Sequence, residues 1–541
     1  MTHHRSSQSP YPPTGAGPVP SYVPGPEAAL ARAVGLHVEG HTREALNELE
    51  AALQMAPDHA ELLAARGHLL CELGQYDQAA WSYTRLFESG TYNPVALYNL
   101  AVCLEKLGRW EQAAERFSEI EALDPERKEA KLGWAICQLH LERPEPALAA
   151  FEGYLSQHPD DETALFGKAV ALQLLWRYEE AAVLYHEALR RNPRSEEVLT
   201  NLIAIALIRK DDDAVRRFAE QLLAFRPYSQ PALEGLASIA FHRGDYEAAA
   251  KLCLKLVELN PEHFETWFNF GVAGQKMKNY ESAVRGYTEA IRLRPDSLQA
   301  FLNLGIVRQE MNDCKGAQDA YERALLISPD TPEVLFNLAT VLELSGQKEQ
   351  AAPIYQRLVA THPDWDEAWF RLGYLRLERS EYDGSVAAFE AALRKNRNWS
   401  EALVNLGLAQ WKAGRLEDAA QTFEHLLKVT PDSVDALRGL AALAVERQDY
   451  TGALAHQARL IDLGERSPEL FYNTGLLLQK SGQLDDAIRL YHEALAERPT
   501  FGEALLNLGH ALKAQGRTEQ AKSYWRQAID AKPELAKGYF A

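Results

Sequence analysis

The chain has 541 residues and a formal net charge of −19, with 76 acidic against 57 basic residues. This excess of carboxylates argues against a nucleic-acid backbone as the main partner, because phosphate binding depends on clustered lysine and arginine. A single hydrophobic core stops growing at about 250 to 300 residues, so a chain of this length either divides into domains or repeats a smaller unit.

Residues 1–25 are rich in proline, serine and glycine. A segment of this composition buries too little apolar surface to order itself, so we expect a disordered tail. It lacks the apolar stretch of a secretory signal, and the chain contains no run of 18 apolar residues, as a membrane helix requires. We therefore expect a cytoplasmic protein that does not enter a membrane.

From Pro26 onward the sequence repeats with a period of 34 residues. Steps of 34 from Pro57 reach a proline at twelve of fifteen places, without an insertion. Such a period is the signature of a repeat architecture, in which each unit packs only against its neighbours. We count fifteen units over residues 26–535, followed by a short stub at 536–541.

The five cysteines contain no C-x-x-C pair; they are Cys71, Cys103, Cys137, Cys253 and Cys314. Cys103 and Cys137 occupy equivalent places in adjacent units, too far apart for the Cα separation of about 4.4 to 6.8 Å in a disulfide. We expect five free thiols, most of them in the core, in a reducing compartment.

The unit at 264–297 shows the internal pattern most clearly. Small and apolar residues recur at helical spacing in two groups: Trp267, Phe270 and Gly271, then Ala283, Tyr287, Ala290 and Ile291. This spacing predicts two amphipathic helices joined by a tight turn. Small residues allow the two helix axes to approach to about 8 to 10 Å. Pro295 ends the second helix because proline lacks a backbone N–H.

These residues, with Pro295, resemble the signature of the tetratricopeptide repeat, a helix-turn-helix unit of 34 residues. The resemblance covers nearly the whole chain. It implies an all-α fold, namely a right-handed superhelical solenoid of about fifteen repeats. It is specific for the fold and says little about the function.

One polar series recurs at the sixth place of each unit, counted from Pro26 as the first place. Asparagine occupies this place in eight units: Asn99, Asn201, Asn269, Asn303, Asn337, Asn405, Asn473 and Asn507. In the tetratricopeptide family this place lines the concave face, so the resemblance implies a broken ladder of amides. Such a ladder suits an extended peptide backbone, because an amide both donates and accepts hydrogen bonds. The alternative is that asparagine is common at this place throughout the family.

Large side chains accompany this series. Arg371 takes the sixth place of its own unit, and Trp411 lies further along the helix of Asn405. We include both with the asparagines in a candidate partner-binding groove. Aromatic residues precede several sixth places: Tyr98, Phe268, Phe336, Phe370 and Tyr472. Their rings would either anchor apolar side chains of a bound peptide or pack helices together.

Two narrower family resemblances were compared residue by residue. The carboxylate clamp that binds acidic chaperone tails is matched only at Asn337 and Arg371, so we expect no clamp. Its remaining places hold Leu302, Ile306 and Glu367. The asparagine series also resembles the repeat half of the O-linked N-acetylglucosamine transferases. Those enzymes carry a catalytic half after the repeats, which we do not expect here because the chain ends at Ala541.

The sequence contains no recognisable catalytic, cofactor or metal motif. His186-Glu187 and His492-Glu493 lack the second histidine of H-E-x-x-H, and no phosphate-binding G-x-x-x-x-G-K-[ST] loop occurs. His37 and His41 are the only histidines four residues apart, and no third ligand is obvious in the sequence. We therefore expect no enzymatic activity, no cofactor and no metal.

Two features near the end of the chain are less regular. The unit from Val434 has Gln457 where other units carry an aromatic residue. Beyond the last unit, Leu535 and Tyr539 lie four residues apart and are predicted to pack on it as one helical face. The alternative is an exposed apolar end that joins a second copy or another protein.

We interpret the chain as a non-enzymatic scaffold or assembly factor that binds another protein or peptide in its concave groove. The first alternative is a substrate-recruiting subunit of a separate enzyme such as a glycosyltransferase. A second alternative, binding of single-stranded RNA by helical repeats, fits the negative charge poorly.

Overall fold

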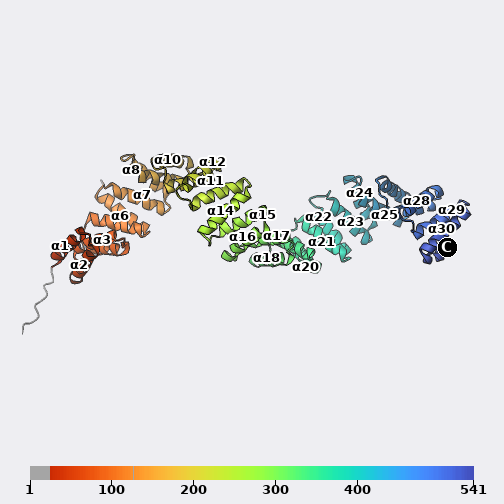
Figure 1. Cartoon of the computed structure of the whole chain (residues 1–541), viewed down its shortest axis with the longest axis horizontal. Helices are drawn as coiled ribbons and strands as arrows, with labels where there is room; N and C mark the ends of the chain where they lie inside the picture. Colours follow the sequence, from red (N-terminus) through yellow and green to blue (C-terminus); the bar gives the residue numbers. More distant parts are fainter. Residues whose placement is uncertain (1–24, 126, 541) are drawn as a thin grey trace, which may run out of the picture. The chain divides into compact units, whose positions relative to one another are not determined.

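The computed structural model describes residues 25–125 and 127–540, without the side chains of 538–540. Across these ranges the regular elements are thirty α-helices and one 3-10 helix, η1 (Pro533–Phe540), and no β-strand occurs (Figure 1). The predicted all-α repeat fold is confirmed. Within the same ranges, no helix combines the length and the apolar character that crossing a bilayer requires.

The chain divides into two compact units, Met1–Leu259 and Asn260–Ala541. The helices of the first unit are α1 (Pro26–Val38), α2 (Thr42–Met55), α3 (Ala60–Glu72), α4 (Tyr76–Glu88), α5 (Pro94–Lys106), α6 (Trp110–Leu123), α7 (Lys128–His140), α8 (Pro144–Leu155), α9 (Glu162–Leu174), α10 (Tyr178–Arg191), α11 (Glu196–Ile208), α12 (Asp212–Leu223), α13 (Gln230–His242) and α14 (Tyr246–Leu259).

The second unit consists of α15 (Phe264–Lys276), α16 (Tyr280–Leu293), α17 (Leu298–Glu310), α18 (Cys314–Ile327), α19 (Pro332–Leu344), α20 (Lys348–Thr361), α21 (Asp366–Glu378), α22 (Tyr382–Ala392), α23 (Ser400–Lys412), α24 (Leu416–Val429), α25 (Val434–Glu446), α26 (Tyr450–Asp462), α27 (Pro468–Lys480), α28 (Leu484–Glu497), α29 (Gly502–Ala514), α30 (Thr518–Ala531) and η1. In both units the odd-numbered helices begin 34 residues apart, so each odd and even pair is one repeat.

A residue with a left-handed backbone conformation turns the chain between the two helices of every repeat. The fifteenth place has a positive φ in all repeats, whether it holds a glycine such as Gly108 (φ 70°) or another residue such as Trp176 (φ 63°). The Gly108 N–H donates to the Glu105 carbonyl, and the Arg109 N–H donates to the Leu104 carbonyl. These two bonds satisfy carbonyls at the end of the first helix and direct the chain into the second.

Inside each repeat, the twenty-fourth place contributes the largest buried side chain in most cases. Six repeats have a tyrosine there, and each of these tyrosines is at most 1% exposed: Tyr83, Tyr185, Tyr287, Tyr321, Tyr355 and Tyr491. Four of these rings lie against a glycine of the first helix, which leaves room for them: Tyr83, Tyr287, Tyr321 and Tyr491. The core is therefore a row of such side chains, aromatic in eleven of the fifteen repeats, in place of a single central core.

At the end of the chain, Leu535 contacts the last repeat, in agreement with the packing prediction. Its side chain is partly buried on the core of α29 and α30 and approaches Gly502. The segment forms the 3-10 helix η1 instead of an α-helical turn. The predicted contact of the Tyr539 side chain lies outside the described side chains.

Candidate functional site

The buried tyrosine hydroxyls form a repeated hydrogen-bond pattern with the first helices. Five of them donate to the oxygen of a glutamine or glutamate at the twelfth place, over 2.7 to 3.2 Å: Tyr185 to Gln173, Tyr287 to Gln275, Tyr321 to Gln309, Tyr355 to Glu343 and Tyr491 to Gln479. Burial raises the pKa of each of these phenols, so each remains protonated and able to donate.

Some of the predicted groove asparagines belong to this pattern. The Asn99 side-chain N–H on α5 donates to the Tyr83 hydroxyl at 3.2 Å, and that of Asn303 on α17 donates to the Tyr287 hydroxyl at 3.4 Å. In both pairs the tyrosine precedes the asparagine by 16 residues and belongs to the preceding repeat. These two amides therefore join neighbouring repeats. This structural role accounts for an asparagine at the sixth place even where no ligand binds.

Two more asparagines bind backbone or side-chain oxygens of the fold. The Asn405 amide on α23 donates to the Glu401 carbonyl at 2.8 Å. The Asn507 amide on α29 donates to the Glu503 carbonyl at 3.1 Å and to the Tyr472 hydroxyl at 3.0 Å. The donors of both side chains are thus already used within the protein.

Four predicted asparagines have no side-chain hydrogen bond to any described residue: Asn201 on α11, Asn269 on α15, Asn337 on α19 and Asn473 on α27. Asn269 and Asn473 are exposed, and the other two are half-buried. The residue 16 places earlier, which is a tyrosine for Asn99 and Asn303, is Cys253 for Asn269 and Gln457 for Asn473. These two amides are the most available to a ligand.

The other two predicted groove residues make contacts between repeats. The Arg371 guanidinium on α21 lies 3.5 Å from a carboxylate oxygen of Glu343 on α19, which also accepts from Tyr355. The Trp411 indole N–H on α23 donates to the Glu446 carboxylate on α25 at 2.7 Å. Both side chains remain half-buried.

The aromatic residues that precede the sixth places pack helices together. The Phe268 ring meets that of Tyr287 edge-on with centroids 5.6 Å apart, and Phe336 meets Tyr355 in the same way at 5.9 Å. Tyr98, Phe370 and Tyr472 make the equivalent contacts in their own repeats. Of the two interpretations of these rings, the structure favours helix packing.

A cavity of about 460 Å³ lies between α25, α26 and α27, where the row of rings is interrupted. Gln457 on α26 takes the twenty-fourth place there and lines the cavity, and its side chain is smaller than the tyrosine ring that six other repeats have at this place. Asn473 lines the same cavity, with apolar side chains such as Val445 and Leu477. Its volume lies in the range of small-ligand sites, about 300 to 1,000 Å³.

Polar groups of this cavity have hydrogen-bonding capacity that no described residue uses. Gln457 is only 7% exposed, and its side-chain oxygen accepts no hydrogen bond from a described residue. A buried acceptor without a donor costs about 1 to 3 kcal/mol, so a ligand that supplies an N–H or O–H would recover that energy. Arg438 and Lys480 bring positive charge, although Arg438 is paired with Glu465 at 2.9 Å.

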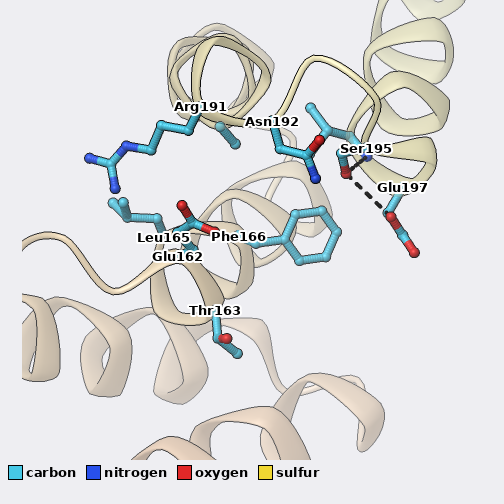
Figure 2. Close-up of a pocket in the computed structure, with 10 residues that line it drawn as sticks. Glu162, Thr163, Leu165, Phe166, Arg191, Asn192, Ser195 and Glu197 are labelled. Carbon is cyan, nitrogen blue, oxygen red and sulfur yellow. Dashed lines mark hydrogen bonds between the residues drawn. The ribbon is translucent and has the colours of Figure 1, made fainter.

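A second cavity, of about 250 Å³, lies between α9 and α11 in the first unit (Figure 2). Its lining includes the Phe166 ring and the Asn192 amide, and several of its polar groups are engaged by the fold. Ser195 caps α11 and donates to Glu197, while Arg191 pairs with Asp160 and Glu187. We therefore take the Gln457 cavity, and not this one, as the candidate functional site.

Two of the cysteines are in contact, which the sequence analysis did not predict because it compared only the cysteines at equivalent places of adjacent repeats. All five are free thiols, and Cys103, Cys137 and Cys253 are buried. The sulfurs of Cys71 on α3 and Cys103 on α5 lie 3.1 Å apart, because the twelfth place of one repeat faces the tenth place of the next. The Cys103 thiol lowers the pKa of Cys71, whereas the bond to Cys71 and burial raise the pKa of Cys103.

Sequence reasoning alone did not identify the Gln457 cavity as a site. The departure at Gln457 was visible in the sequence, and Asn473 was among the predicted groove residues. The signal that was overlooked is their separation in the sequence: Gln457 precedes Asn473 by 16 residues, as Tyr287 precedes Asn303. A polar residue at both places predicts an unfilled space beside an unpaired amide.

Several known proteins resemble the chain. Tetratricopeptide-repeat models match residues 37–80, 108–170, 309–372 and 478–537, then 64–128, 208–263, 345–402 and 404–468, and also 264–297. A coatomer epsilon subunit model matches residues 146–231. A curated relative, the small glutamine-rich tetratricopeptide repeat-containing protein 2 of Mycosarcoma maydis, is 33% identical over 101 residues. That match covers 18% of this chain and 29% of the relative, so less than a third of its length is spanned.

Solved structures are similar over different lengths. YrrB, described as a tetratricopeptide-repeat protein with an unusual peptide-binding site, is 25% identical. The match covers 35% of this chain and 98% of YrrB, with a TM-score of 0.32. A chain of the APC/C hetero-tetramer Cut9-Hcn1 is 15% identical, with 85% of this chain and 98% of that chain covered and a TM-score of 0.32. Because the repeat models together match most of its sequence, this chain belongs to the tetratricopeptide-repeat family.

Proposed function

We propose that the protein is a non-enzymatic scaffold that binds an extended polypeptide across its first helices. The single observation that carries the proposal is the Gln457 cavity, which is lined both by a buried acceptor and by the Asn473 amide, neither of which has a hydrogen-bond partner among the described residues. A peptide backbone or side chain supplies N–H donors for the first and accepts from the second. The apolar walls suit the aliphatic part of the same side chain.

The amides outside the cavity extend this surface. Asn269 and Asn337 have no bond to another described side chain, and both lie in the second unit with Asn473. They would hold peptide bonds without regard to sequence, while the cavity selects one side chain that ends in an N–H or O–H donor.

The test uses the substitution Gln457→Tyr, which places in this repeat the residue that six other repeats carry. The ring occupies the cavity, and Asn473 stands where it can donate to the new hydroxyl, as Asn303 donates to Tyr287. Because Val445 takes the twelfth place and offers no acceptor, thermal unfolding is measured to show that the variant is folded. Peptides selected on the natural chain from a phage-displayed random library should bind the variant about tenfold more weakly or worse, since about 1.4 kcal/mol of lost contact suffices.

Asn405→Ala is the matched control, because that amide already bonds to the Glu401 carbonyl of its own helix. It should leave the affinity of the selected peptides unchanged, while Asn473→Ala should lower it. Equal affinity for the natural chain and for Gln457→Tyr, measured by fluorescence anisotropy, would show that the cavity is not a peptide site.

A second candidate function, a subunit of a vesicle coat, is supported by the coatomer epsilon match over residues 146–231. That segment runs from α8 to the beginning of α13 in the first unit. This candidate predicts that purified coatomer binds the first unit and that exchange of residues 146–231 for other tetratricopeptide repeats abolishes the binding. Binding that survives the exchange would count against it.

A further inference from the structure

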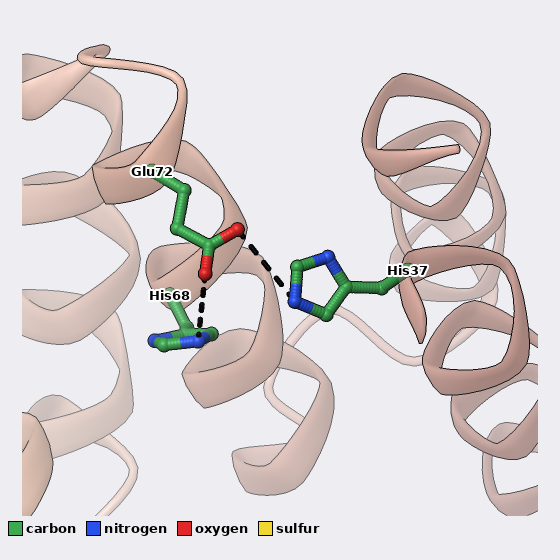
Figure 3. A group of neighbouring side chains, drawn as sticks. All are labelled: His37, His68 and Glu72. Carbon is green, nitrogen blue, oxygen red and sulfur yellow. Dashed lines mark ion pairs between the residues drawn. The ribbon is translucent and has the colours of Figure 1, made fainter. Parts of the chain in front are cut away.

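Two histidines and a glutamate of the first two repeats converge on one point. His37 lies near the end of α1, and His68 and Glu72 lie one turn apart on α3. Figure 3 shows the Glu72 carboxylate between the two imidazole rings. One ligand atom from each of the three side chains lies within 4.8 Å of the other two.

The two imidazole nitrogens approach different oxygens of the Glu72 carboxylate, at separations close to those between ligands of a common ion. The His68 Nε2 atom lies 3.4 Å from Glu72 Oε1, and the His37 Nε2 atom lies 3.6 Å from Glu72 Oε2. Ligands at about 2.0 to 2.1 Å from a tetrahedral Zn²⁺ are about 3.3 to 3.4 Å from one another by simple geometry.

A third helix contributes to the orientation of His37. The Thr42 hydroxyl, at the start of α2, lies 3.4 Å from His37 Nδ1. Metal-binding histidines usually have a hydrogen-bond partner on the ring nitrogen that does not bind the metal, and this partner fixes the ring orientation. Here it leaves His37 Nε2 directed at Glu72.

Solvent reaches all three side chains. Their exposed fractions are 30% for His37, 57% for His68 and 43% for Glu72. An ion can therefore enter without a prior opening of the helices. The ligand chemistry is selective, because imidazole nitrogens suit Zn²⁺ and related transition metals, whereas Ca²⁺ and Mg²⁺ prefer oxygen ligands throughout.

We propose that His37, His68 and Glu72 form a Zn²⁺ site between the first and second repeats. Two imidazole nitrogens and one carboxylate oxygen supply three ligands, and the fourth position is left for water or for a side chain of a bound protein. The ion ties α1 to α3. Within the described residues the first repeat has a neighbouring repeat on one side, and the ion adds a link to that neighbour.

The sequence analysis considered only His37 and His41 together and expected no metal there. His41 lies four residues after His37 but outside the cluster, and its Nδ1 atom lies 3.3 Å from Glu44 of α2, the helix that His41 precedes. The chain reverses at Gly40 (φ 87°), so the two histidines leave different helices. His41 is therefore a built-in control for the proposal.

The test is titration of the full chain with Zn²⁺ by calorimetry after treatment with a chelator. His37→Ala, His68→Ala and Glu72→Gln should each weaken binding about tenfold or more, and Thr42→Ala about tenfold. His41→Ala should bind as the natural chain does. Because His3 and His4 also offer imidazoles, all titrations use a background in which both are alanine.

A second readout separates loss of the site from loss of the fold. Zn²⁺ should slow amide hydrogen exchange in α1 and α3 of the natural chain, and it should leave the rates in Glu72→Gln unchanged, while the two metal-free proteins exchange alike. The proposal is overturned if the natural chain shows no binding, or if the cluster variants bind Zn²⁺ as tightly as His41→Ala does.

Discussion

At the scale of single residues, several glycines lie so close to the ring at the twenty-fourth place that a Cβ atom would overlap it. A Cβ atom on Gly167 would lie 2.4 Å from Cζ of Phe151, whose side chain is fully buried. Residues of α7, α8 and α9 enclose the ring in one apolar cluster, which restricts its movement. Glycine is required there for close approach and not for backbone freedom.

The substitution Gly167→Ala should therefore destabilise the protein by about 1 to 3 kcal/mol through overpacking. Gly153→Ala is the matched control on the neighbouring helix α8, since a Cβ there meets no atom within 4 Å. It should stabilise by about 0.5 to 1 kcal/mol, because alanine favours the helix. The midpoints of urea unfolding measure both effects, and equal midpoints for the two variants would contradict the packing argument.

The Cys71–Cys103 contact supports a prediction at the same scale. Addition of diamide should oxidise these two thiols to a disulfide, because their sulfurs already lie 3.1 Å apart and the pKa of Cys71 is lowered. The two protons and two electrons pass to diamide. Burial raises the pKa of Cys137 to about 12 and that of Cys253 to about 11, so both should stay reduced.

Peptide mass mapping after alkylation identifies the thiols that have reacted. Cys71→Ser should abolish the cross-link and leave Cys103 open to alkylation in the unfolded protein. Recovery of both alkylated thiols from the oxidised natural chain would show that the two sulfurs do not meet in solution.

At the scale of elements, one helix carries a residue that opposes its own structure. Pro353 is the sixth residue of α20 and is exposed, so it removes a backbone hydrogen bond of the helix without filling space in the core. No other repeat has a proline at the equivalent place. The surrounding contacts of Ala351, Ala352 and Tyr355, which are all buried, hold the helix together.

Pro353→Ala should raise the stability of the protein by about 1 to 3 kcal/mol. Proline costs about 3 kcal/mol more than alanine inside a helix. The gain in stability on its removal is smaller than this, because alanine gives the unfolded chain more conformational entropy. Urea unfolding measures the gain in stability. Gln421→Ala is the control, because it introduces alanine at the equivalent exposed place of α24 without removing a proline. No gain over that control would mean that α20 is already distorted around Pro353.

At the scale of the whole molecule, stability comes from contacts between successive hairpins, so each compact unit should fold without the other. The fragment 260–541 should show a helical far-UV circular dichroism spectrum and a cooperative thermal transition. The fragment 278–541, which lacks α15, should melt at a lower temperature because Tyr287 and Ala283 lose the helix that buries them. Loss of helical structure in 260–541 would contradict the division of the chain.

The sequence by itself determined the repeating element of this protein. The period of 34 residues, the helical spacing around Trp267 and Tyr287, and the small residues between helices predict every hairpin, because each pattern lies within one repeat. The positive φ at the fifteenth place was harder to see, since seven repeats have a residue other than glycine there.

The tertiary structure alone decided which side chains of different repeats meet. It joined Asn303 to Tyr287, Cys71 to Cys103 and His37 to Glu72, and it left Gln457 without a donor. The reason is physical: helical periodicity is a local property of the chain. Contacts between repeats depend on how two helices cross and on the volume that each side chain fills.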